Sequence, residues 1–128
     1  PHLKDLSPLV AAQRASEICG AAILLKGANS IIAAPNGSTW QLVETAPWVA
    51  RAGWGDVLAG FAAGLGALGC SSSSGFKHNL LAVAALIHSN SAFRCQEGSS
   101  ASVLAQNLAH FVREIEGERC IRIHSETS

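Results

Sequence analysis

The chain has 128 residues, with nine Lys or Arg and nine Asp or Glu, so its formal net charge is zero. This length fits one domain rather than two, and the lack of a basic excess argues against a protein that binds nucleic acid or an anionic membrane. Apolar residues make up 48% of the chain and charged residues 14%, against about 25% charged residues in a typical soluble domain. So much apolar surface argues against intrinsic disorder and predicts a piece of a longer protein or a subunit of a homo-oligomer.

The four cysteines are too far apart to form a CxxC redox or zinc pair; they are Cys19, Cys70, Cys95 and Cys120. The polar first residues lack the apolar core of a secretory signal. We therefore expect a cytoplasmic protein whose thiols are free and buried. The apolar run 57–69 would span about 20 Å as a helix, short of the roughly 30 Å of a bilayer core. It predicts a buried helix and no membrane span.

The first expected elements are a helix and a strand. Ser7 followed by Pro8 is typical of a helix start, small and polar residues then alternate with helical spacing, and Gly20 provides a stop. The pattern predicts a helix over 8–19. The uninterrupted apolar run 21–25 predicts a buried, parallel strand at the centre of a sheet.

A hairpin is expected next. Two short strand candidates, 31–34 and 39–43, flank a segment that contains Asn36 and Gly37. Asn-Gly between two apolar runs is the strongest short-range hairpin signal, because both residues tolerate the positive φ that tight hairpin turns need.

Three helices are expected in the rest of the chain, near 56–68, 76–93 and 100–114. The first is apolar on all sides and is expected to be buried on most faces. Its Gly60 and Gly64 lie one turn apart and would allow another backbone to approach closely.

The order of strand, hairpin, glycine loop and helices predicts an α/β domain. The tail 119–128 is expected to be a short edge strand or a loose end. Only one strong buried strand is present, and one strand with three helices cannot build a sheet covered on both faces. We therefore expect further strands in residues outside this chain.

The segment most indicative of chemistry is Gly53-Trp54-Gly55-Asp56, directly before an expected helix. Glycines let backbone N–H groups point into open space, and the helix N-terminus adds its dipole, so the segment could hold a phosphate. Asp56 could then accept a proton from an attacking hydroxyl, as phosphoryl transfer requires. The alternative is structural, because Asp is an ordinary N-cap and glycine is common in loops.

A second polar segment follows the expected buried strand. It comprises Lys26, Gly27, Ala28, Asn29 and Ser30. Ligands of open α/β sheets bind beyond the carboxyl ends of the strands, where the Lys26 charge could meet a phosphate and the side chains of Asn29 and Ser30 a phosphate or ribose. The alternative is a solvated lysine at a strand end.

Three segments together, 24–28, 31–37 and 50–60, resemble the ADP-dependent NAD(P)H-hydrate dehydratases. This family belongs to the ribokinase-like superfamily as a carbohydrate-kinase-type domain, and the resemblance covers about residues 8–95. It implies a doubly wound α/β sheet with helices on both faces. Because the family domain is about twice as long, residues 1–128 would be the C-terminal portion of a single ribokinase-like nucleotide-binding domain.

The resemblance also implies a reaction, that of a lyase in metabolite repair. The hydroxyl of hydrated NADH or NADPH is phosphorylated by ADP (or ATP), and phosphate is then eliminated to restore the dinucleotide. Mg²⁺ is expected with the nucleotide, with no protein ligand for it identifiable here. An N-terminal epimerase domain often precedes the family domain. Since the nicotinamide-binding residues are expected in the missing half, this chain alone should be inactive.

Matching of motif positions implies the roles of single residues. The nucleotide would be contacted by Lys26, Gly27, Ala28, Asn29 and Ser30, and its phosphates by Gly53 and Gly55. Asp56 would contact the hydrate and act as the base. Two positions depart from the family: Trp54 could cover the nucleotide base or block the pocket, and Arg51 could add charge at the phosphates.

Two other functions compete with this hypothesis. One is a ribokinase-like kinase for a vitamin precursor, which shares the Gly-x-Gly-Asp motif. The other is a non-catalytic remnant that serves in nucleotide binding or assembly. The five histidines show no metal-ligand spacing, and His88, within an apolar helix pattern, is expected to be a hydrogen-bonded core or interface residue.

Overall fold

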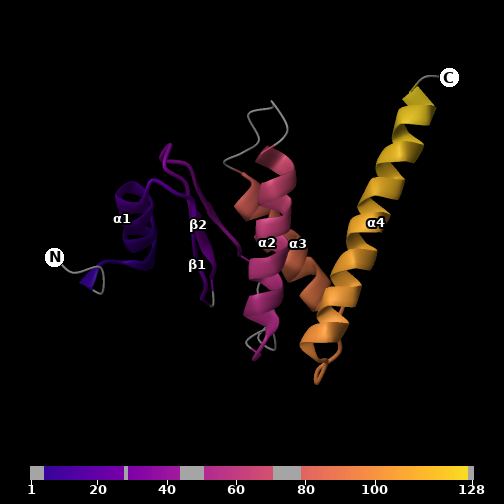
Figure 1. The fold of residues 1–128 in the computed structure, drawn as a ribbon, viewed down its shortest axis with the longest axis horizontal. Coiled ribbons are helices and arrows are strands. Elements are labelled where there is room, and N and C mark those ends of the chain that lie inside the picture. Colours follow the sequence, from indigo (N-terminus) through magenta and orange to yellow (C-terminus); the bar gives the residue numbers. More distant parts are fainter. Residues whose placement is uncertain (1–4, 28, 44–50, 71–78, 127–128) are drawn as a thin grey trace.

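The computed structural model describes residues 5–27, 29–43, 51–70 and 79–126 as a small sheet with four helices (Figure 1). In chain order the elements are α1 (Pro8–Cys19), β1 (Ile23–Leu25), β2 (Ile31–Ala33), β3 (Thr39–Gln41), α2 (Trp54–Cys70), α3 (Leu80–Phe93) and α4 (Ala101–Glu126). None of the helices in these ranges has the length and apolarity needed to cross a bilayer.

Helix α1 begins and ends where the sequence predicts. Pro8 occupies the first turn, and the carbonyl of Ser7 accepts a hydrogen bond from the Ala11 amide at 2.8 Å. The Ser7 side chain makes no capping hydrogen bond, so it marks the start by backbone conformation alone. Gly20 ends the helix with φ +62°, a left-handed conformation that glycine adopts without strain.

The hairpin is confirmed. Strands β2 and β3 pair antiparallel, with Ile32 opposite Trp40. Within the turn, Gly37 has φ +86°, and the side chain of Asn36 accepts a hydrogen bond from the Ser38 amide at 3.0 Å. The positive φ and the hydrogen bond both depend only on neighbouring residues, which explains why the Asn-Gly dipeptide was enough to predict the turn.

Strand β1 differs from its expectation. It pairs antiparallel with β2 and lies at the edge of the described sheet, whose order is β1-β2-β3. The prediction of a parallel, central strand is therefore wrong for this sheet. The connection to β2, residues 26–30, is too short for the crossover of a dozen or more residues that parallel neighbours need.

Helices lie on both faces of the sheet, as the fold class predicts. On one face α1 packs against β1 and β2, with Ala12 in contact with Ile31 and Ala33. Helices α2 and α3 lie on the opposite side (Figure 1), and Ile32, which alternates with these two residues, is completely buried. The architecture is that of a partial α/β domain.

Helix α2 is more exposed than its composition suggests. It packs against α3 and α4 and buries Trp54 and Leu58, but Leu68 is 73% exposed. A Cβ added to Gly60 or Gly64 would meet no atom within 4 Å. The expectations of burial on most faces, and of a backbone packed closely against these glycines, are wrong for the described residues.

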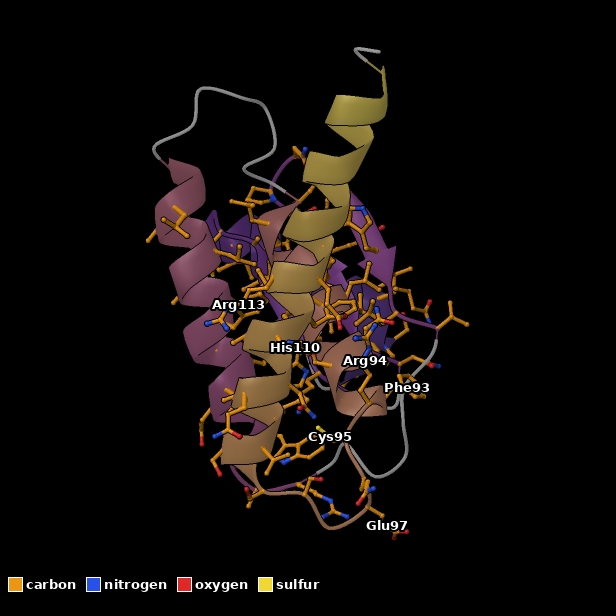
Figure 2. All side chains as sticks on the ribbon, turned by 90° about the vertical axis from the view of Figure 1, so that its right-hand side faces the viewer. Phe93, Arg94, Cys95, Glu97, His110 and Arg113 are labelled. Atoms are coloured by element: carbon orange, nitrogen blue, oxygen red, sulfur yellow. The ribbon has the colours of Figure 1, made fainter. Side chains whose placement is uncertain are left out.

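A second core lies between the ends of the helices. Trp54, Ala92, Cys95 and Leu104 form it, from the beginnings of α2 and α4 and the end of α3. Helix α4 crosses in front of α2 and α3 in Figure 2, and it continues to Glu126, so the expected edge strand or loose end over 119–128 is wrong up to that residue.

The described cysteines have different environments. Cys95 is a buried free thiol, as expected, whereas the free thiol of Cys19 is exposed at the last residue of α1. The expectation of burial is therefore wrong for Cys19, whose position at the helix end faces solvent.

Candidate functional site

The structure brings the two polar segments together. Lys26 directly follows β1, and Gly55 lies in the first turn of α2. The Lys26 Nζ atom is 3.9 Å from the position that a Cβ would occupy on Gly55. A lysine charge therefore lies over the N-terminus of a helix, although the two residues belong to different parts of the fold.

At the start of α2, some backbone amides donate to backbone carbonyls and others do not. Gly53 has φ +81°, the Trp54 amide donates to the Arg51 carbonyl at 3.3 Å, and the Val57 amide donates to the Gly53 carbonyl at 3.1 Å. Among the described residues, the intervening amides of Gly55 and Asp56 make no such bond. Free amides at a helix start, with the positive end of the dipole, favour an anion such as phosphate.

The carboxylate of Asp56 is exposed. No described residue donates a hydrogen bond to it or forms an ion pair with it. The alternative interpretation of Asp56 as an N-cap, whose side chain accepts a hydrogen bond from the helix backbone, is therefore wrong within the described part. The carboxylate is free to accept a proton from another molecule at the open end of α2.

Trp54 does not lie in front of this site. Its side chain is 1% exposed and packs with Ala92, Cys95 and Leu104 in the helical core. The expectation that it covers a nucleotide base or blocks the pocket is wrong, because the first turn of α2 directs this side chain into the protein.

His88 is the residue that sequence reasoning did not connect to the site. It is 3% exposed, as expected of a hydrogen-bonded core histidine, and its Nε2 lies 3.0 Å from the Trp54 carbonyl oxygen. Because a carbonyl only accepts, Nε2 carries the proton. Burial lowers the His88 pKa below its usual range, the hydrogen bond to Trp54 opposes this effect, and the Lys26 charge adds to it. Helical periodicity alone gave no signal for this contact.

The other predicted residues of the Lys26 segment are placed less directly. Gly27 and Asn29 are exposed after β1, whereas Ser30 is 7% exposed and its carbonyl accepts a hydrogen bond from the Leu42 amide at 2.9 Å. Ala28 lies outside the described residues. Contact of these four residues with a nucleotide stays a prediction, as does the contribution of Arg51.

No group of three or more His, Cys, Asp or Glu side chains that could hold a metal ion occurs in the part of the chain that the structure describes. The site there consists of one lysine, backbone amides and one free carboxylate. These groups suit an anion and a proton transfer.

Three curated relatives match parts of the chain. The bifunctional NAD(P)H-hydrate repair enzyme Nnr of Synechocystis sp. is 43% identical over 65 residues, which is 51% of this chain and 12% of the relative. The protein of the same name from Salinibacter ruber is 37% identical over 112 residues, 85% of this chain and 19% of the relative. The ADP-dependent (S)-NAD(P)H-hydrate dehydratase of Xanthomonas campestris is 42% identical over 48 residues, 38% of this chain and 17% of the relative.

The chain thus spans less than one fifth of the length of each of these relatives. No solved structure matches it. The family model described as NAD(P)H-hydrate dehydratase matches residues 3–114, which include every element from α1 to the first half of α4. The chain belongs to the NAD(P)H-hydrate dehydratase family.

Proposed function

We propose that this chain provides the phosphate-binding and proton-accepting part of an enzyme that dehydrates hydrated NADH and NADPH with ADP. The observation that carries the proposal is the approach of Lys26 to Gly55, in a helix turn where two amides and the Asp56 carboxylate have no partner within the described part of the chain. A relative that is named for ADP dependence supports the choice of nucleotide.

Nucleotide binding follows from the charges at the start of α2. The terminal phosphates of ADP would accept hydrogen bonds from the Gly55 and Asp56 amides, and Lys26 would neutralise part of their charge as a compact ammonium group. Because these donors are already held in place, they can stabilise the charge that develops during phosphoryl transfer.

Asp56 would act as the base. It would accept the proton of the hydrate hydroxyl as that oxygen forms a bond to the terminal phosphorus of ADP and the bond from this phosphorus to AMP breaks. The bond from carbon to the phosphate oxygen would then break, and the neighbouring ring carbon would lose a proton to the departing phosphate or to water. This elimination would form the carbon–carbon double bond and restore NADH or NADPH. Mg²⁺ would arrive with the nucleotide, since it is usually held by phosphates and water; the described residues offer no acidic cluster, and we assign it no protein ligand.

The remaining parts of the proposal concern the whole protein. Residues 1–128 would be the C-terminal portion of a single ribokinase-like domain, and the rest of that domain would bind the nicotinamide. An epimerase domain would precede it, as the word bifunctional in the names of two relatives supports. The apolar composition supports a homo-oligomer, and we place the protein in the cytoplasm.

Replacement of Asp56 by asparagine in the full-length protein tests the role of the base. We expect D56N to lower the rate of NADH-hydrate dehydration by about 10²–10⁴-fold, the usual contribution of general base catalysis. The ADP dissociation constant, measured by titration calorimetry, should stay within about threefold of the wild-type value, since the amide keeps the shape of the side chain.

The matched control is D5N, which removes an exposed carboxylate ahead of α1 and should leave the rate unchanged. An unchanged rate in D56N would remove Asp56 from the mechanism. Turnover of a hydroxymethylpyrimidine or thiazole alcohol with ATP, without repair of the hydrate, would favour the vitamin-precursor kinase. Binding of ADP without either reaction would favour the remnant.

A further inference from the structure

We propose that His88 is a positioning residue, which holds the Trp54–Gly55 peptide so that the Gly55 amide faces the nucleotide phosphate. This inference rests on the proposed function above and deepens it. It assigns a role in binding to a side chain that need not touch the nucleotide.

The argument begins with the peptide plane. The carbonyl of Trp54 and the N–H of Gly55 belong to one peptide group, which is trans, as no cis peptide occurs in the described chain. In a planar trans peptide these two groups point in opposite directions. The hydrogen bond of 3.0 Å that fixes the Trp54 carbonyl on His88 Nε2 therefore also fixes the direction of the Gly55 amide.

The segment needs such a restraint because glycine lies on both sides of Trp54. Gly53 and Gly55 have no Cβ to limit their backbone angles, so the first turn of α2, where helix ends readily fray, can be distorted even while the indole stays in the core. The Trp54 side chain holds the Trp54 end of the Trp54–Gly55 peptide in the helical core. His88 anchors its carbonyl from a different helix, α3.

The surroundings of His88 make this hydrogen bond hard to replace. The other residues that α3 buries are small, namely Ala84, Ala85, Ser91 and Ala92. Without His88, the carbonyl of the completely buried Trp54 would lose its imidazole partner and keep only the hydrogen bond that the helix itself provides. The Lys26 charge favours neutral His88, and the neutral ring with its proton on Nε2 donates to the Trp54 carbonyl.

The experiment compares three variants of the full-length protein. H88A removes the donor, H88Q keeps an N–H donor at similar reach, and S91A is the matched control from the same helix. Ser91 is as buried as His88, but its hydroxyl finds no hydrogen-bond partner among the residues that the structure describes. The readouts are the ADP dissociation constant and the ¹⁵N–¹H chemical shift of the Gly55 amide in ligand-free protein.

We expect H88A to weaken ADP binding by about tenfold or more, H88Q to recover most of the loss, and S91A to bind within about twofold of wild type. The Gly55 amide resonance should move in H88A and hold its position in S91A. If H88A does not fold, H88M makes the same comparison with H88Q, because Met fills the volume without offering a donor.

Folded H88A that binds ADP as tightly as wild type would overturn the positioning role, and so would an unmoved Gly55 resonance. A wild-type protein that does not bind ADP would instead reject the proposed function, and the role in nucleotide binding with it. The two failures are distinguishable, because the first leaves wild-type binding intact.

Discussion

At the scale of single residues, Gly53 fixes how the chain enters α2. Its φ of +81° is strained for any residue with a side chain, and a Cβ there would lie 3.1 Å from the Cβ of Ala101 in α4. We expect G53A to lower the free energy of unfolding by about 1–3 kcal/mol, since backbone strain and a tight contact add. Chemical denaturation measures this difference.

The control for Gly53 is Gly20, which also has positive φ, but a Cβ added there would meet no atom of the described residues within 4 Å. G20A should therefore cost only about 1 kcal/mol, the strain alone. Equal losses of unfolding free energy in G53A and G20A would show that the close approach of Gly53 to Ala101 does not constrain the loop.

We expect the stability to respond to an alanine at Gly55 in the opposite way to an alanine at Gly53. It is not among the described glycines with positive φ, and a Cβ there would reach ordinary contact with Lys26 Nζ at 3.9 Å. G55A should keep or raise the stability by up to about 1 kcal/mol, because alanine favours the helix. The same methyl group would occupy the space between Lys26 and the free amide, so we expect ADP affinity to fall about tenfold by calorimetry. Unchanged affinity would place the phosphate elsewhere.

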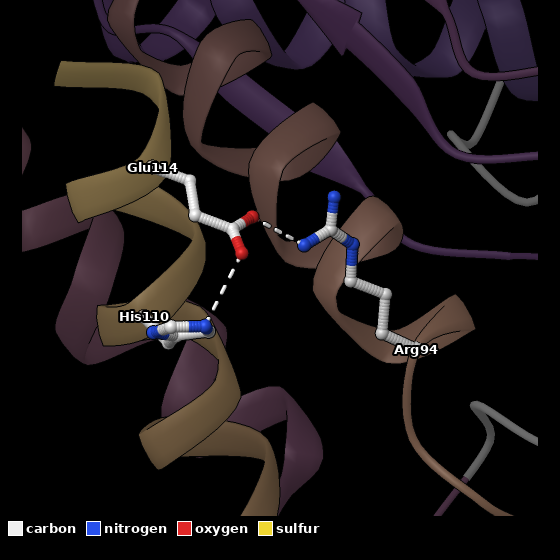
Figure 3. Close-up of polar contacts among 3 residues, drawn as sticks. All are labelled: Arg94, His110 and Glu114. Carbon is white, nitrogen blue, oxygen red and sulfur yellow. Dashed lines mark hydrogen bonds and ion pairs between the residues drawn. The ribbon is translucent and has the colours of Figure 1, made fainter. Parts of the chain in front are cut away.

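At the scale of elements, an exposed cluster of charges joins α3 to α4 (Figure 3). Arg94, at the end of α3, donates to Glu114 at 2.5 Å and lies 4.4 Å from the centre of the Phe111 ring, while His110 lies 3.2 Å from the same carboxylate. The hydrogen bond from Arg94 holds the pKa of Glu114 below its usual range. The cluster links the end of α3 to the middle of α4.

This lowered pKa predicts the direction of a pH effect. A carboxyl group whose pKa is lower in the folded state stabilises the fold above its unfolded pKa, and that stabilisation is lost as the pH falls through the folded value. We expect E114Q to lower the thermal midpoint slightly at about pH 7 and by less at about pH 3, below the unfolded pKa. E97Q, which alters an exposed carboxylate in the turn before α4, should match wild type at both pH values. A difference in thermal midpoint between E114Q and wild type that grows as the pH falls would contradict a stabilising, charged Glu114.

The elements that could be predicted from the sequence are those with local determinants. Proline and glycine mark both ends of α1, and Asn36 with Gly37 makes the hairpin turn. The exposed side of α2 could not be predicted, because a helix of alanine, glycine and leucine has no polar face to indicate orientation. The antiparallel pairing of β1 was missed because an apolar run does not specify the direction of its neighbour, although the short connection to β2 does.

At the scale of the whole molecule, the candidate site lies between two cores. Lys26 comes from the part built on α1 and the sheet, and Gly55 comes from the helical core around Trp54. The family resemblance implied that both segments contact the nucleotide, and their approach agrees with that expectation. The contact from His88 could not be predicted, because it depends on how α3 packs against the start of α2, and that packing is a long-range property.

The burial of Trp54 gives the site its own optical reporter. An indole in an apolar environment fluoresces at shorter wavelength than one in water, and this indole is 1% exposed one residue before the Gly55 amide. Any ligand or substitution that disturbs the entry into α2 must also change the surroundings of this ring. Emission from a protein in which Trp40 and Trp48 are replaced by phenylalanine would therefore follow events at the anion site directly.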